Sequence, residues 1–278
     1  MTQKNNIDFL IINYSDSGGS GHHAQLFTEK LIRNGFSAEL LVVIKKSTKD
    51  YVKRYSVKEK NNYRVKRKFE DKLNFYKKKY CFYDRGRYII DSVSSFKKNY
   101  FKKPKAIVLM WTSLFISNLI AYKFSKLYNS KLFIHPLDKA HFFGGCHYNS
   151  GCFNYLNNCK NCPAVPFYNN NLPFKKFAKQ SLLSTHFNLI YHIPWMKKYI
   201  NSLNHLNFKN TYFVSAEQPK DLSSNNRDFL KKKFGFSDYI TVLFGTTNFQ
   251  DYHKGYHLAE KVILELDKSL VNKKIMII

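Results

Sequence analysis

Four closely spaced cysteines are the residues whose types most directly suggest chemistry. They follow the pattern C-x5-C-x6-C-x2-C and are Cys146, Cys152, Cys159 and Cys162. Four thiolates in one loop can meet the tetrahedral demands of zinc, and C-x2-C is a common half-site. The spacing therefore predicts a structural zinc ion. Reduced packing cysteines, one or two disulfides and an iron–sulfur cluster are the alternatives.

Glycines near the start of the chain form a second candidate site. The run Ser17-Gly18-Gly19-Ser20-Gly21 follows the apolar segment Ile7–Asn13 and precedes a predicted helix. A glycine-rich turn that opens a helix lets backbone N–H groups approach a phosphate, which the positive end of the helix dipole favours. A plain tight turn is the alternative. Near the other end, Lys254 before Gly255 could meet a diphosphate as a point charge, or be a solvated surface lysine.

Alternating apolar segments indicate which elements position these residues. Short apolar runs of the kind that buried parallel strands show alternate with segments of helical periodicity. They predict an α/β fold built on a doubly wound, Rossmann-like parallel sheet, in which ligands lie at the carboxyl ends of the strands. The predicted strands are Ile7–Asn13, Ala38–Ile44, Ala106–Trp111, Lys131–Pro136, Phe187–Ile193, Thr211–Val214, Tyr239–Phe244 and Lys274–Ile278. The predicted helices are Ala24–Arg33, Ser113–Tyr128, Trp195–Leu203, Arg227–Phe234 and Tyr256–Asp267.

The charge is large but uneven. The 278 residues include 46 Lys and Arg against 19 Asp and Glu, a formal net charge of +27, of which residues 45–105 hold 22 basic and 6 acidic side chains. Only 7 of the cations are Arg, the residue best suited to phosphates and guanine edges, so we expect no nucleic-acid partner. The basic stretch is predicted to be a solvated insertion, or one that attracts an anionic membrane or substrate.

The chain shows no targeting segment. Its first residues are polar, and no run of 18 apolar residues occurs. A cytoplasmic location, in which thiols stay reduced, is therefore expected.

The cysteine loop resembles the signature of one branch of bacterial family 4 glycosyltransferases. From Asp138 to Tyr148 the chain has D-K-A-H-F-F-G-G-C-H-Y, similar to the family's D-x-A-x-x-T-G-G-C-H-Y, and the later C…C-x2-C-P agrees as well. Segments on both sides resemble the family in the same order: the glycine-rich run, Lys105–Ser113, Phe229–Gly235 and Val242–Gly245 with Lys254-Gly255. The chain departs from the pattern at Leu137 and Phe143, where relatives usually have His and Thr.

The resemblance implies a retaining, nucleotide-sugar-dependent transferase of the GT-B fold that acts in surface polysaccharide biosynthesis. Its acceptor would be a polysaccharide or a lipid-linked sugar at the inner face of the membrane. Asp138 and His147 would be catalytic, while His22, His135 and His141 are further candidates for proton handling. The implied donor-binding residues are Gly18, Gly19, Ser20, Gly21, Lys254 and Gly255.

The resemblance also implies a division of the chain. Residues 1–215 would form the acceptor-side domain, with the basic insertion 45–105 and the cysteine loop 138–166, and residues 216–278 an incomplete donor-binding domain. The family's E-x7-E motif would lie beyond Ile278, so a truncated enzyme is expected. The alternatives are a non-catalytic, zinc-stapled remnant or accessory protein, and a nucleic-acid-binding protein.

Overall fold

The chain divides into two compact units, Met1–Ala216 and Glu217–Ile278. This division lies one residue from the expected boundary at 215/216. The computed structural model describes residues 6–56, 81–82, 88–165, 171–201, 203–215, 224–242, 245, 254–269 and 274–277. Residues 57–80 and 83–87 of the basic insertion 45–105 lie outside these ranges.

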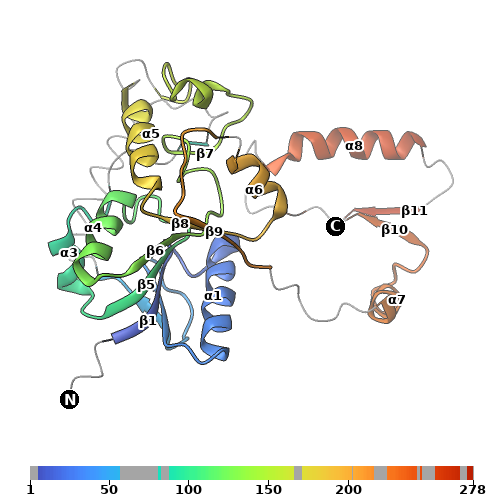
Figure 1. Cartoon of the computed structure of the whole chain (residues 1–278). Coiled ribbons are helices and arrows are strands. Elements are labelled where there is room, and N and C mark those ends of the chain that lie inside the picture. The colour runs from blue at the N-terminus through green and yellow to red at the C-terminus, as the bar shows by residue number, and fades with distance from the viewer. Residues whose placement is uncertain are drawn as a thin grey trace. The chain divides into compact units, whose positions relative to one another are not determined.

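A parallel sheet forms the centre of the first unit (Figure 1). Its seven described strands are β1 (Asn6–Ile12), β2 (Ala38–Val42), β3 (Val52–Arg54), β5 (Lys103–Leu109), β6 (Lys131–Ile134), β8 (Asn188–Tyr191) and β9 (Asn210–Phe213). They lie in the order β3-β2-β1-β5-β6-β8-β9, so the direction of winding reverses between β1 and β5. This is the doubly wound, Rossmann-like arrangement that the apolar runs predict, and its ligand crevice is expected where the order reverses.

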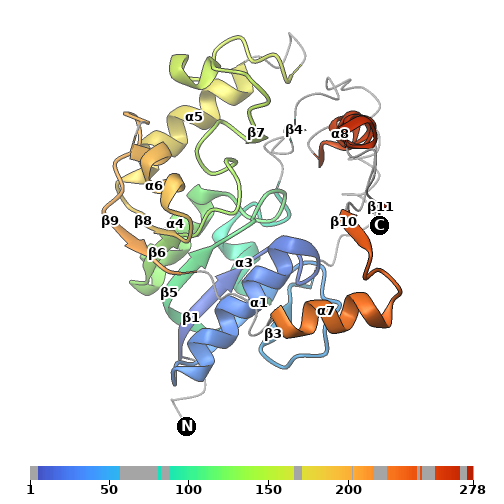
Figure 2. The ribbon, with the colours of Figure 1, turned by 90° about the vertical axis from the view of Figure 1, so that its right-hand side faces the viewer.

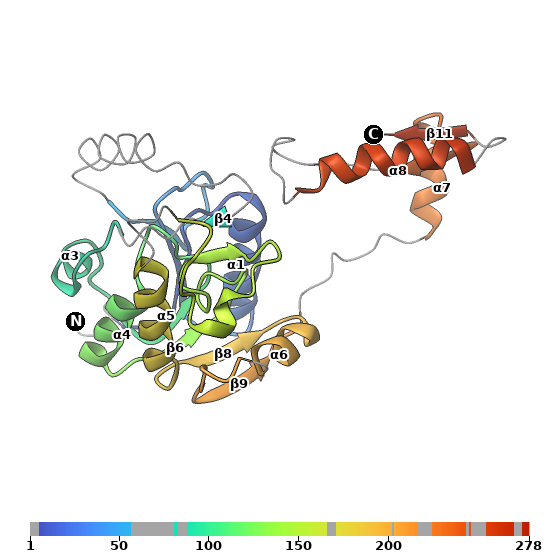
Figure 3. The ribbon, with the colours of Figure 1, turned by 90° about the horizontal axis from the view of Figure 1, so that it is seen from above.

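Helices cover both faces of the sheet. Because successive strand residues point to opposite faces, Leu10 and Ile12 of β1 join one buried cluster and Ile11 joins the other. The helices α3 (Val93–Asn99) and α4 (Asn118–Tyr128) pack on the first face through Phe96 and Phe124. The helix α1 (Gly18–Arg33) covers the second face, as Figures 2 and 3 show.

The glycine-rich run is the first turn of α1 rather than a separate turn before a helix at Ala24. Gly21 makes this possible because a Cβ there would lie 2.3 Å from the backbone carbon of Asp16. Among the described residues, Ser17 at the N-cap makes no side-chain cap hydrogen bond. By contrast, Ser92 caps α3 and Ser117 caps α4. The first turn of α1 therefore keeps N–H groups without a side-chain cap.

Other boundaries differ from the predictions for local reasons. The helix α4 begins at Asn118 rather than Ser113 because Ser117 caps it and Leu114 has a positive φ of 66°. The strand β3 and the helix α3 fall inside the basic insertion and were not predicted. A short antiparallel pair, β4 (Cys81–Phe82) with β7 (Cys146–Tyr148), links the insertion to the cysteine loop.

Three further elements of the first unit are described: η2 (Asn154–Asn157), α5 (Asn171–Ser184) and α6 (Pro194–Asn201). The second unit contains α7 (Ser224–Lys233), β10 (Tyr239–Val242), α8 (Tyr256–Ser269) and β11 (Lys274–Ile277). The strands β10 and β11 pair in parallel and are joined through α8, a βαβ unit. Within the described ranges, no helix has both the length and the apolar character needed to cross a membrane.

Candidate functional site

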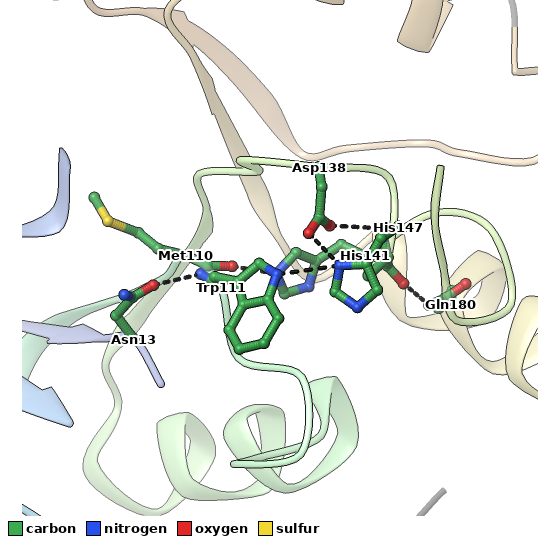
Figure 4. A network of polar contacts seen from close by, with 8 residues as sticks. Asn13, Met110, Trp111, Asp138, His141, His147 and Gln180 are labelled. Carbon is green, nitrogen blue, oxygen red and sulfur yellow. Dashed lines mark hydrogen bonds and ion pairs between the residues drawn. The ribbon is translucent and has the colours of Figure 1, made fainter. Parts of the chain in front are cut away.

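Asp138 and His147 meet at the two ends of the loop that follows β6 (Figure 4). The carboxylate Oδ2 contacts the imidazole Nδ1, and the side chains of His147 and Asp138 are only 2% and 6% exposed. The other carboxylate oxygen accepts a hydrogen bond of 2.8 Å from the backbone N–H of Ala140. The backbone N–H of Lys139 donates to the carbonyl of His147 at 3.2 Å. This buried pair therefore closes the loop.

Trp111, two residues after the end of β5, contacts the same imidazole. Its indole Nε1 lies 3.1 Å from Nδ1 of His147, and its backbone N–H donates to Oδ1 of Asn13 at 2.8 Å. An indole N–H only donates, and an ionised carboxylate only accepts. A proton on Nδ1 thus favours the contact with Asp138, and its absence favours the bond from Trp111. The loop is tied in this way to the ends of β1 and β5, where the strand order reverses.

Two more side chains hold the loop in place. Nε2 of His141 lies 2.6 Å from the carbonyl oxygen of Met110, and its Nδ1 lies 3.0 Å from Oδ1 of Asn118. From α5, Gln180 donates to the carbonyl of Ala140 at 2.7 Å and accepts from the N–H of Gly144 at 2.9 Å. His141 is thus engaged in holding structure, although the sequence suggests it for proton handling.

The structure explains why two positions of the loop have the residues Phe143 and Gly144. Gly144 has a positive φ of 52°, and a Cβ there would lie 2.5 Å from the carbonyl oxygen of Pro173 in α5. Only glycine fits this approach without displacing α5. The ring of Phe143, at the position where the resembling family has Thr, is buried and stacks on Tyr155 with ring centroids 4.3 Å apart.

All four loop cysteines are free thiols. Cys159 and Cys162 are buried, and Cys146 donates a hydrogen bond to Cys162. That bond lowers the pKa of Cys162 and raises that of Cys146. The sulfur of Cys152 accepts from the N–H of Asn154 at 3.4 Å. The donor set of four thiols suits zinc.

We expect the purified chain to contain one equivalent of cysteine-bound zinc, which the change Cys162→Ser would remove because it takes away one of four ligands. Elemental analysis together with thiol titration of the metal-free and metal-loaded protein would measure this. A folded, metal-free protein whose four loop thiols all react at the same rate with and without added zinc would contradict the expectation.

The predicted donor-binding residues fall in both units. Gly18 and Gly19 are exposed at the first turn of α1, Ser20 is half-buried, and Gly21 is buried. In the second unit, exposed Lys254 precedes Gly255, whose carbonyl accepts from the N–H groups of Leu258 and Ala259 at the start of α8. The glycine-rich run therefore lies at the N-terminus of α1, the element after β1 in the chain. Lys254 and Gly255 lie at the N-terminus of α8, which follows β10 in the chain.

A cluster of three histidines was not predicted from the sequence. In the described part of the chain, His23, His135 and His192 are the single group of three His, Cys, Asp or Glu residues whose ligand atoms all lie within 4.8 Å of one another. The four cysteines do not form such a group. Burial lowers the pKa of His23 to about 4 and also lowers the pKa values of His135 and His192. Burial thus favours the uncharged form of each ring.

The sequence nevertheless contains a signal for this cluster. His135 and His192 come at the ends of two predicted strands, and the carboxyl ends of parallel strands share one edge of a sheet. His22, a further candidate for proton handling, is exposed and lies outside the cluster.

A scan of protein-family models finds no match to the chain, and no curated protein matches it at a significant level.

Proposed function

We propose that the chain is a retaining glycosyltransferase, or the part of one that carries the acceptor-side domain, and that its first unit binds the phosphates of a nucleotide-sugar donor. The observation that carries this proposal is the glycine-opened N-terminus of α1, which lacks a side-chain cap among the described residues. It directly follows β1, one of the two strands between which the sheet order reverses. The proposed reaction, retaining sugar transfer, comes from the resemblance of the cysteine loop to family 4 glycosyltransferases.

The first turn of α1 suits a diphosphate. Gly18 and Gly19 have no described atom within 4 Å of an added Cβ, so an anion can approach their backbone N–H groups closely. The helix dipole adds a partial positive charge there. When the anomeric bond breaks, the diphosphate gains negative charge, which these groups would stabilise while the positive charge on the sugar ring grows. The net charge of +27 would draw anionic donors toward the protein.

We assign Asp138 and His147 a positioning role within this site. Their contact is almost fully buried, so in this conformation it holds the loop rather than meeting a substrate. Trp111 links the pair to the end of β5. A zinc ion held by the four cysteines would stabilise the loop. The basic stretch 45–105 would attract an anionic lipid carrier or membrane surface.

The change Gly19→Asp tests the donor site. A side chain fits there, and an acidic group in the first turn of a helix stabilises that helix by about 0.3–1 kcal/mol. The same carboxylate would repel a diphosphate. We therefore expect normal or slightly increased stability together with at least a tenfold loss of nucleotide-sugar binding, measured by calorimetry, and of sugar transfer or donor hydrolysis.

The matched control is Gly19→Asn, which adds the same volume without charge and should bind the donor more tightly than Gly19→Asp. Equal donor binding by both variants and the wild type would exclude α1 as the phosphate site. A folded wild-type chain that neither binds nor turns over any of a panel of nucleotide sugars would favour the non-catalytic accessory protein instead.

A further inference from the structure

Three histidines from three separate elements converge in the first unit. His23 lies in α1, His135 directly follows β6, and His192 directly follows β8. The distance from Nε2 of His135 to Nε2 of His23 is 3.4 Å, and that to Nδ1 of His192 is 3.2 Å. The group is thus built by rigid elements that are far apart in the sequence.

Hydrogen bonds among the three rings cannot pair all of the nitrogens that face one another. A ring nitrogen offers a single in-plane site, which is either an N–H donor or a lone pair. Nε2 of His135 faces two other ring nitrogens, so one strong hydrogen bond to one neighbour leaves the other unpaired. A cation placed between the three lone pairs would satisfy all of them at once.

The observed spacing agrees with metal coordination. Tetrahedral zinc binds histidine nitrogens at about 2.0–2.1 Å, which places two such nitrogens about 3.4 Å apart. The separations from Nε2 of His135 to Nε2 of His23 and to Nδ1 of His192, 3.4 and 3.2 Å, are already close to this value. The ligand nitrogens of His23 and His192 lie within 4.8 Å of each other. Both rings are half-buried, so a modest rotation of either one would complete the tetrahedral geometry.

We propose that His23, His135 and His192 bind one divalent transition-metal ion of the zinc type through Nε2, Nε2 and Nδ1, leaving one coordination position open. Three imidazole donors suit Zn²⁺, Co²⁺, Ni²⁺ and Cu²⁺, whereas Mg²⁺ and Ca²⁺ prefer oxygen ligands. Three protein ligands with one open position are typical of zinc sites that bind water or a substrate oxygen.

The surroundings of the cluster support a specific site. His135 is 1% exposed, and the ring of Phe27, one turn after His23 in α1, packs on it with centroids 5.2 Å apart. His23 and His192 are half-buried, which gives an ion a path from solvent. The open position would lie at the carboxyl edge of the sheet, where ligands of doubly wound folds bind. The proposal does not depend on the glycosyltransferase assignment.

Cobalt titration of the full chain tests the site. After removal of metals with a chelator, Co²⁺ is added and visible absorption is recorded. We expect one equivalent with the intense d–d bands of a tetrahedral site but without the near-ultraviolet charge-transfer band that thiolate ligands produce, which separates it from metal at the cysteines. The variants His23→Gln and His192→Gln should lose this equivalent.

The matched control is His22→Gln, which changes the exposed neighbour of His23 and should keep full binding and the same bands. Far-ultraviolet circular dichroism would verify that each variant is folded. Because His23 is half-buried, its variant should fold even where a change at buried His135 does not. The proposal would be overturned by a wild type that binds no Co²⁺ or only thiolate-ligated Co²⁺. Unchanged binding in His23→Gln and His192→Gln would overturn it equally.

Discussion

Replacing Asp138 with Ala is expected to lower the free energy of unfolding by about 1–3 kcal/mol, the usual cost of leaving a buried polar group without its hydrogen-bond partner. The change leaves the imidazole of His147, 2% exposed, without its carboxylate, and the N–H of Ala140 without its acceptor. Both lie in the segment after β6 that also carries Cys146. We therefore also expect faster reaction of the loop thiols with a thiol reagent.

Chemical denaturation followed by circular dichroism measures the stability change, with Lys105→Ala as a control. Lys105 pairs with Asp8 but is 76% exposed, so its loss should cost about 0–1 kcal/mol. Asp138→Asn retains an acceptor for Ala140 and should fall between Asp138→Ala and the wild type. If Asp138→Ala unfolds within 1 kcal/mol of the wild type, the pair does not hold the loop.

Gly21→Ala is expected to destabilise the first unit by about 1–3 kcal/mol or more, because the new methyl group meets backbone rather than a movable side chain. The added Cβ would lie 2.3 Å from the carbon and 2.8 Å from the oxygen of the Asp16 carbonyl. Asp16 in turn accepts hydrogen bonds from the N–H groups of Lys46 and Ser47 beyond β2. A shift of the Asp16 backbone would therefore also disturb the loop after β2 that contains Lys46 and Ser47.

Gly19→Ala is the matched change within the same turn of α1. An added Cβ there meets no described atom within 4 Å, so this variant should be as stable as the wild type or up to about 1 kcal/mol more stable. Thermal unfolding of the two variants side by side measures the difference. Equal stability of Gly19→Ala and Gly21→Ala would show that the approach of α1 to Asp16 is not tight.

The sequence predicts the central strands well because each is buried on both faces and reads as a continuous apolar run. The strand β3 was missed because it lies at the sheet edge, where Lys53 and Arg54 are exposed and break that run. The helix α5 was missed because Lys and Gln interrupt its apolar positions and a proline lies in its first turn. Edge strands and amphipathic helices are stabilised by contacts with neighbouring elements, and a local sequence pattern does not reveal those contacts.

The candidate site was predictable in part. The loop resemblance selects Asp138 and His147, which lie together, but their burial depends on Trp111 and on α5 and could not be read from spacing. The cysteine spacing places four thiols in one loop without fixing how their sulfurs meet. His23 was passed over because a histidine on a helix has no distinctive pattern until the ends of β6 and β8 lie beside it.

The contact between Gln180 and the loop after β6 bears on how such a loop can diversify. Within the described part of the chain, the side chain of Gln180 bonds to two main-chain groups, the carbonyl of Ala140 and the N–H of Gly144. Every amino acid except proline presents the same two groups, so exposed side chains of the loop can be exchanged while the path of its main chain is preserved. A loop fixed in this way can vary its exposed surface without losing its shape.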